Sequence, residues 1–232
     1  MVVLSPAMKL SPQIEAKLHE LCSVFLEENA KVNLSAFRTD EACFIGNVLD
    51  SVAALDHPLF EKENLKILDI GTGGGFPLLP LAICKPNSTF VGLDSVQKKI
   101  DAIGRIADTL NLSNVTLICG RTEDYGHKPE FREQFDIVTA RAVAELPVLL
   151  EYTSPFVKVK GCSVLWKSMK IDEELQDSLL ARAEFSSHLT ERHTYELPGD
   201  WGKRQLLFFE KGHTLHTKYP RDVGIPKKDP II

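Results

Sequence analysis

Residues 65–75 read Leu-Lys-Ile-Leu-Asp-Ile-Gly-Thr-Gly-Gly-Gly and join a short apolar run to a glycine-rich loop. The run at 65–70 predicts a buried strand, and the glycines after it predict a turn that a ligand can approach closely. In open α/β sheets, ligands bind at the carboxyl ends of the strands, where such a loop lies. This stretch therefore predicts both a class of fold and the position of a binding site.

Segments typical of strands and helices alternate from residue 65 onward, which predicts an α/β fold of the Rossmann-like, doubly wound type with a mostly parallel sheet. Two amphipathic helices are expected before the first strand. One begins at Pro12 with Ser11 as its N-cap, and the other begins at Thr39 or Asp40 and ends before Pro58. The expected strands are 65–70, 89–93, 115–119, 135–140, 163–167, 193–197 and 205–210.

The length of 232 residues suits one α/β domain with an appendage. We divide it into an N-terminal helical cap (1–60), a Rossmann-like core (61–211) and a basic C-terminal tail (212–232), which together form one globular unit. The tail contains proline and lysine, and we expect it not to form a packed element.

Composition excludes several classes of protein. A net charge of −5 argues against a bare electrostatic binder of nucleic acid, although local basic patches remain possible. The five cysteines are scattered and form no C-x-x-C pair, so neither a disulfide framework nor a metal site is expected. No apolar stretch is long enough to cross a bilayer, and no secretion signal is present. We expect a soluble, cytoplasmic protein without a membrane or metal partner.

The glycine loop distinguishes between two ligands. A dinucleotide site requires G-x-G-x-x-G, but the sixth position is Phe76 counted from Gly71 and Leu78 counted from Gly73. The loop instead fits D-h-G-x-G-x-G, the pattern of Rossmann-like methyltransferases, whose cofactor S-adenosylmethionine has no pyrophosphate. Asp69 is expected to meet the ammonium group of the cofactor, directly or through water. Three glycines of the loop are expected to contact the cofactor, namely Gly71, Gly73 and Gly75.

Residues after the next two strands extend this expected site. Asp94 closes the second strand about twenty residues after the loop, where a carboxylate can accept hydrogen bonds from both ribose hydroxyls. After the third strand, Thr122 and Glu123 lie where the adenine edge is expected. Glu123 could equally cap a helix.

Several segments occur in the order found in the RsmG (GidB) family. They are Asn33-Leu34-Ser35, Leu49-Asp50-Ser51, the loop at 67–73, Gly75-Phe76-Pro77, Leu93-Asp94-Ser95 and Ala140-Arg141-Ala142-Val143. Lys98-Lys99, Tyr219-Pro220-Arg221 and Gly224-Ile225-Pro226 are similar too. The sequence thus resembles, from residue 33 to 226, the bacterial guanine-N7 methyltransferases of small-subunit ribosomal RNA.

This resemblance implies S-adenosylmethionine as the methyl donor and a guanine N7 in a 16S RNA loop, guanine 527 in the family, as the acceptor. The implied partner is 16S rRNA or the small ribosomal subunit. The resemblance places cofactor contacts on Gly71, Phe76, Thr122, Glu123 and Arg141. The chain departs from the family at Asn47, usually His, and at Leu78 and Ser168, both usually Gly.

The sequence contains no recognisable catalytic motif, which is consistent with this reaction. Guanine N7 has a free lone pair and needs no general base, so catalysis would come from orientation. Arg141 could hold the cofactor or guanine O6, and Lys167 could hold an RNA phosphate, although both could be structural. The tail residues Lys218, Arg221, Lys227 and Lys228, beside Tyr219, are a further expected RNA contact.

Two other functions remain open at this point. One is a methyltransferase that acts on a small molecule or a protein, and the other is an RNA-binding module without catalysis. Turnover with the cofactor would distinguish the second, and the identity of the methylated acceptor would distinguish the first.

Overall fold

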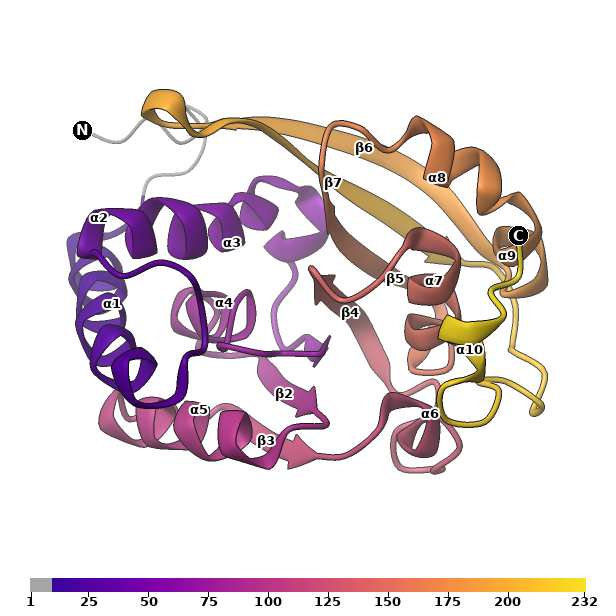
Figure 1. Cartoon of the computed structure of the whole chain (residues 1–232), viewed down its shortest axis with the longest axis horizontal. Coiled ribbons are helices and arrows are strands. Elements are labelled where there is room, and N and C mark those ends of the chain that lie inside the picture. The colour runs from indigo at the N-terminus through magenta and orange to yellow at the C-terminus, as the bar shows by residue number, and fades with distance from the viewer. Residues whose placement is uncertain (1–9) are drawn as a thin grey trace.

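A seven-stranded sheet runs through the molecule in the computed structural model, which describes residues 10–232 (Figure 1). Its strand order is β3-β2-β1-β4-β5-β7-β6. The first five strands in this order are parallel, and β7 is antiparallel to both neighbours. The predicted Rossmann-like, mostly parallel fold is confirmed. The strands are β1 (Lys66–Ile70), β2 (Thr89–Asp94), β3 (Val115–Cys119), β4 (Phe135–Arg141), β5 (Val157–Lys167), β6 (Ser187–Leu197) and β7 (Gly202–Lys211).

The position of β1 explains the apolar run that precedes the loop. β1 pairs with β2 on one side and with β4 on the other. Ile67, Leu68 and Ile70 are each at most 1% exposed, because helices cover both faces of the sheet. The strand order reverses between β1 and β4, and a crevice opens at the carboxyl ends of strands at such a reversal. The loop after β1 therefore lies where a ligand is expected.

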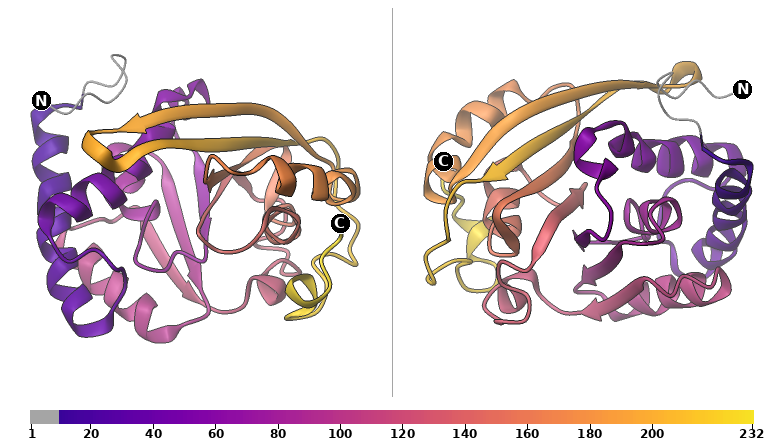
Figure 2. Two further views of the ribbon diagram at one scale, coloured as in Figure 1. Left: turned by 45° about the horizontal axis from the view of Figure 1, so that its top comes forward. Right: turned by 180° about the vertical axis from the view of Figure 1, so that it is seen from behind.

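Helices cover both faces of the sheet (Figure 2), and the buried hydrophobic residues form three clusters. The first contains residues of α1, α4 and α5, and the second contains residues of α7, α8, α9 and the segment after β7. The third contains residues of β1, β2, β4 and β5. Val164 and Leu165 of β5 belong to different clusters, as the two-residue period of a strand requires. The helices of these layers are α1 (Pro12–Val32), α4 (Leu78–Cys84), α5 (Gln97–Thr109), α6 (Thr122–Tyr125), α7 (Leu146–Thr153), α8 (Asp172–Asp177) and α9 (Leu179–Glu184).

The helices of the N-terminal region agree in place with the sequence, but the second is irregular. The hydroxyl oxygen of Ser11 accepts a hydrogen bond from the Ile14 N–H and caps α1, as predicted. The second helix contains a π-helical turn, which hydrophobic periodicity does not reveal. Its segments are α2 (Asp40–Cys43), the π-helix η1 (Phe44–Leu49), α3 (Asp50–Val52) and the 3-10 helices η2 (Ala53–Asp56) and η3 (Pro58–Glu61).

The hairpin of β6 and β7 is longer than the sequence predicted. It extends across the molecule towards the N-terminal helices, and its turn contains the 3-10 helix η4 (Gly199–Trp201) (Figure 2). The predicted strand at 193–197 is only the last part of β6. The first part was missed because Leu189 is its only apolar residue among polar ones, as is usual for an edge strand that must not pair with other chains.

The expectation of an unpacked C-terminal tail was wrong. Leu215 and Tyr219 are buried, and a short helix, α10 (Ile225–Lys228), follows them. The Arg132 guanidinium donates hydrogen bonds to the main-chain oxygens of Leu215, His216 and Tyr219. Arg221 pairs with the buried carboxylate of Glu151 on α7, with 2.7 Å between Nη2 and Oε2. Most of these contacts are polar, so the spacing of hydrophobic residues in the sequence does not predict them.

Arg221→Met should lower the free energy of unfolding by about 3 kcal/mol, because it leaves the buried Glu151 carboxylate without its charged partner. Urea unfolding measures the loss, and Lys62→Met, at an exposed lysine, is the control. The double variant Arg221→Met/Glu151→Met should recover part of the loss. An Arg221→Met protein as stable as the wild type would show that this pair does not anchor the C-terminal residues.

Candidate functional site

The loop after β1 has a backbone that requires glycine. Gly71, Gly73 and Gly75 have φ angles of 64°, 55° and 86°, a region that other residues rarely adopt. A Cβ on Gly71 would lie 2.7 Å from Val143 Cγ2, in the segment that follows β4. The loop is therefore packed closely against the end of β4, and its backbone forms the floor of the crevice.

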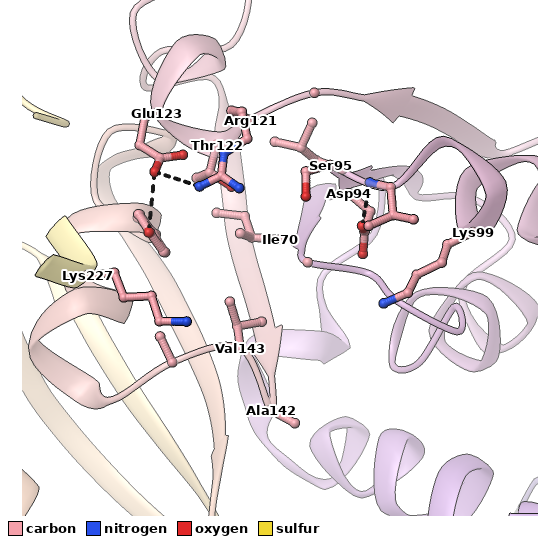
Figure 3. A pocket seen from close by; sticks show the side chains of 16 residues that line it. Ile70, Asp94, Ser95, Lys99, Arg121, Thr122, Glu123, Ala142, Val143 and Lys227 are labelled. Carbon is pink, nitrogen blue, oxygen red and sulfur yellow. Dashed lines mark hydrogen bonds and ion pairs between the residues drawn. The ribbon is translucent and has the colours of Figure 1, made fainter. Parts of the chain in front are cut away.

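Asp94 connects this loop to β2. Its Oδ2 accepts a hydrogen bond from the Gly73 N–H and its Oδ1 accepts one from the Val96 N–H, both at 2.9 Å. The carboxylate thus ties the loop to the end of β2. Its remaining lone pairs are available to the cavity that it lines (Figure 3). Contact with ribose hydroxyls stays a prediction.

Two cavities flank the loop. The first, of about 300 Å³, lies at the carboxyl ends of β1, β2 and β3. The second, of about 230 Å³, lies between the loop and the N-terminal cap. Gly71, Lys99 and Ala142 line both, so the two are neighbours. The predicted site residues that line one or both cavities are Gly71, Gly73, Phe76, Asp94, Thr122, Glu123 and Arg141.

Asp69 and Gly75 do not line these two cavities. Asp69 is 1% exposed, and its Oδ1 accepts a hydrogen bond from the Thr139 hydroxyl at 2.7 Å. Its Oδ2 and the Thr72 hydroxyl have no hydrogen-bond partner among residues 10–232. Burial raises the pKa of Asp69 to about 7, although the bond from Thr139 opposes the shift. The expected contact with an ammonium group stays a prediction.

Glu123 is buried, and its Oε1 already has partners. It accepts hydrogen bonds from the Gly224 N–H at 3.0 Å and from Arg121 Nη2 at 3.1 Å. Burial acts to raise the pKa of Glu123, but these donors hold it below its usual range. Burial, reinforced by the Glu123 charge, raises the pKa of Tyr152 to about 12. One carboxylate oxygen therefore binds the C-terminal segment, and the adenine contact predicted for Glu123 stays untested.

Arg141 ends β4 and binds the N-terminal cap. Its Nη1 donates to Asp50 Oδ2 at 2.8 Å and to the Gly46 main-chain oxygen, and its Nη2 donates to Asn47 Oδ1. The ion pair is partly buried, and the Phe76 ring lies 6.0 Å from the guanidinium carbon. Asn47, where the resembling family usually has His, is thus a direct partner of Arg141. The π-helical turn η1 brings these acceptors to one guanidinium.

A third cavity, of about 690 Å³, shares Arg141 and Ala142 with the second. It is lined by aromatic and cationic side chains, a combination that suits nucleic acid bases and phosphates. Sequence reasoning identified only Arg141, Lys167 and Ser168 here. It missed the rest because they come from the cap, β5 and the β6–β7 hairpin, which only the fold brings together. The aromatic and cationic residues of this lining are Phe37, Trp166, Tyr195, Trp201, Arg141, Lys167, Lys170, Lys203 and Arg204.

Lys167 lines this third cavity but is engaged within the protein. Its ammonium donates to Glu174 Oε2 at 2.6 Å and to the Ala144 main-chain oxygen at 3.0 Å. Leu78, another departure from the family, is buried and lies beneath the loop, where its Cδ2 is 2.6 Å from a Cβ built on Gly92. Leu78 therefore fills the space that Gly92 leaves and does not reach the ligand side of the loop.

The four basic residues of the tail have different surroundings. Lys218 pairs with Glu184 at 3.1 Å, and Arg221 pairs with Glu151. Lys227 lines the first cavity, opposite Lys99 (Figure 3). The RNA contact that the sequence predicted for these four residues stays a prediction. Across residues 10–232, no cluster of His, Cys, Asp or Glu could hold a metal ion, and no helix is long and apolar enough to span a membrane.

Comparisons with known proteins agree with this geometry. A family model described as rRNA small subunit methyltransferase G (GidB) matches residues 14–197. Ribosomal RNA small subunit methyltransferase G of Streptococcus pyogenes serotype M5 (strain Manfredo) is 37% identical over 223 residues, covering 96% of this chain and 93% of the relative. The protein of the same name from Lactococcus lactis subsp. lactis (strain IL1403) is 37% identical over 225 residues, covering 97% and 94%.

Solved structures share the fold at low sequence identity. A SAM dependent methyltransferase from Aquifex aeolicus gives a TM-score of 0.53 at 16% identity, over 72% of this chain and 92% of that one. The structure of M. jannaschii TYW2 in complex with AdoMet gives a TM-score of 0.51 at 17% identity, over 70% and 76%.

Asp69→Asn should change how stability depends on pH. The folded pKa of about 7 lies above the unfolded value of about 3.9, so the folded state binds the extra proton between these values. The contribution of Asp69 is therefore present below about pH 4 and is lost as the pH rises to about 7. Asparagine cannot titrate. As the pH rises from about 4 to about 7, the free energy of unfolding of Asp69→Asn should therefore rise relative to that of the wild type, by about 1.4 kcal/mol per unit of pKa difference. Urea unfolding at pH 4.5 and pH 8 measures this, and an unchanged difference would contradict the raised pKa.

Proposed function

Because this chain belongs to the rRNA small subunit methyltransferase G (GidB) family, we propose that it methylates the N7 of a guanine in small-subunit ribosomal RNA. The family and its S-adenosylmethionine-dependent rRNA methylation rest on the match over residues 14–197 and on 37% identity over nearly the whole chain. The guanine, its N7 and the residues that bind it are the proposal. We also propose 16S rRNA as the partner and the cytoplasm as the location.

The first two cavities fit the adenosyl and methionine parts of the cofactor. The first has apolar walls from Leu93, Val96 and Val143, which suit a purine ring, and a carboxylate from Asp94, which suits ribose hydroxyls. The second is bounded by the loop glycines, Phe76 and Arg141. Asp69 Oδ2 and the Thr72 hydroxyl are buried and have no hydrogen-bond partner among the described residues, and Thr72 also lines the second cavity. Once bound, S-adenosylmethionine supplies an electrophilic methyl group on a sulfonium.

One observation carries the proposal for the acceptor: the aromatic and cationic third cavity meets the cofactor cavities at Arg141 and Ala142. Tyr195 lines this cavity and donates to Asp50, the partner of Arg141, so a base that stacks on its ring would lie near that junction. Stacking of a base on an aromatic side chain contributes about 1–3 kcal/mol. Lys203 and Arg204 lie at the same cavity and suit the phosphates of the strand that carries the base.

The surroundings of this junction favour an acceptor that needs no deprotonation. Among the described residues that line the three cavities, none is a histidine. The Tyr195 hydroxyl donates to Asp50 Oδ1 at 2.6 Å, and burial together with the Asp50 charge raises its pKa. The Asp50 carboxylate already accepts hydrogen bonds from Arg141 and Tyr195. Guanine N7 has a free lone pair at neutral pH, so positioning by the cavity would suffice.

The decisive experiment is methyl transfer from radiolabelled S-adenosylmethionine to small-subunit rRNA, followed by mapping of the modified base. RNA transcribed with 7-deazaguanosine lacks the proposed nucleophile and should accept no label, although it should still bind the protein. Binding is measured separately by filter retention. Label in the 7-deaza RNA would move the acceptor to another atom, and label only in a small molecule or a protein would favour that alternative class of methyltransferase.

Arg141→Lys should slow methyl transfer at saturating cofactor by at least about tenfold. One ammonium cannot reproduce the separate bonds of the guanidinium to Asp50 and Asn47, so the junction of the cavities loses its fixed geometry. Single-turnover rates report the chemical step. Arg105→Lys, which alters a guanidinium paired with Glu28 away from the cavities, is the matched control. Equal effects of the two substitutions would deny Arg141 a special role.

A further inference from the structure

One residue of the C-terminal segment, Lys227, lines the first cavity. We define the C-terminal strap as residues 219–229. We propose that the strap is part of the cofactor site, and that the Lys227 ammonium donates a hydrogen bond to a ring nitrogen of the adenine. This inference rests on the proposed function, because it concerns the same site.

The strap is fixed against the core at two carboxylates. Glu151 of α7 accepts hydrogen bonds from the Arg221 N–H at 2.8 Å and from its guanidinium at 2.7 Å. Glu123 of α6 accepts one from the Gly224 N–H at 3.0 Å. Gly224 has a φ of 84°, a value that glycine adopts without strain and that turns the chain into α10. The helix that carries Lys227 therefore has a defined position at the cavity.

Lys227 reaches the cavity and its neighbour does not. Lys227 is among the residues that line the cavity, whereas Lys228 is not. Figure 3 shows the Lys227 side chain extending over the cavity from one side, while Lys99 extends from the other. Within residues 10–232, neither Lys227 nor Lys99 forms an ion pair, in contrast to Lys218 and Arg221. The charge of Lys227 is thus available to a ligand.

The position of Lys227 suits an acceptor on the purine. The cavity lies at the ends of β2 and β3, where Leu93, Val96 and Val143 form apolar walls. Glu123 is the acid that sequence placed at the adenine edge, but its Oε1 binds Gly224 of the strap. An ammonium can only donate, and the ring nitrogens of adenine can only accept. Lys227 thus adds a cationic donor to the cavity that Glu123 also lines.

The test is calorimetric titration of S-adenosylmethionine and of its neutral product S-adenosylhomocysteine into the full-length protein. Lys227→Met keeps most of the unbranched apolar side chain and removes the donor, and Lys228→Met is the matched control one residue away. Lys227→Met should weaken both ligands by the same factor, about tenfold, because the adenosyl group is common to both. Lys228→Met should leave both affinities unchanged, and Lys227→Arg should restore part of the loss.

Three results would overturn the inference. Wild-type affinity in Lys227→Met would remove Lys227 from the site. Tighter binding of cationic S-adenosylmethionine alone would mean that Lys227 only repels charge. Unchanged cofactor affinity with weaker binding of rRNA would assign Lys227 to the RNA surface. If the wild-type protein binds neither ligand, the proposed function itself fails, which separates that failure from the failure of the inference. Unfolding of the unliganded variants shows that the fold is intact.

Discussion

The ion pair between Arg141 and Asp50 connects the three parts of the molecule that form the site. Arg141 ends the central strand β4, and Asp50 lies in the N-terminal cap. Asp50 also accepts a hydrogen bond from the Tyr195 hydroxyl of β6, and its main-chain oxygen accepts one from the Trp166 indole of β5. Cap, sheet and hairpin therefore meet at one carboxylate. Because the pair is partly buried, loss of either partner would leave a charge with little water to solvate it.

This ion pair lies between two parts of the site, around β1 and β4, that are built in different ways. On one side, the glycine loop forms a floor that Asp94 ties to the end of β2. On the other side, the aromatic cavity is assembled from segments that are distant in the sequence. The whole chain has a net charge of −5, yet Lys203, Arg204 and Lys170 gather at that cavity. The basic side chains of that cavity thus outnumber its two carboxylates, Asp50 and Glu174.

The sequence predicted what local chemistry determines. The loop glycines, the buried strand before them and the position of Asp94 all follow from backbone geometry and from the strand period. The sequence did not predict features that depend on contacts between distant segments. The tail is packed because Glu151 and Glu123 bind Arg221 and Gly224, and no periodicity reveals such polar anchors. Trp201 and Phe37, whose rings lie 5.3 Å apart, line the cavity only because the hairpin crosses the cap. The π-helical turn likewise was not predicted, although it carries Gly46 and Asn47, two of the hydrogen-bond acceptors of Arg141.

The buried carboxylates of Glu151 and Glu123 have a consequence for synthesis of the protein. Arg221 and Gly224 follow their partners Glu151 and Glu123 by 70 and 101 residues along the chain. While these residues are still inside the ribosome, the emerging chain holds two carboxylates that burial would leave unmatched. The core around these carboxylates can therefore close fully only after residues 221–224 have left the ribosome. A chain cut before residue 221 would keep both carboxylates unmatched, so proteases could distinguish it from a chain that contains the strap.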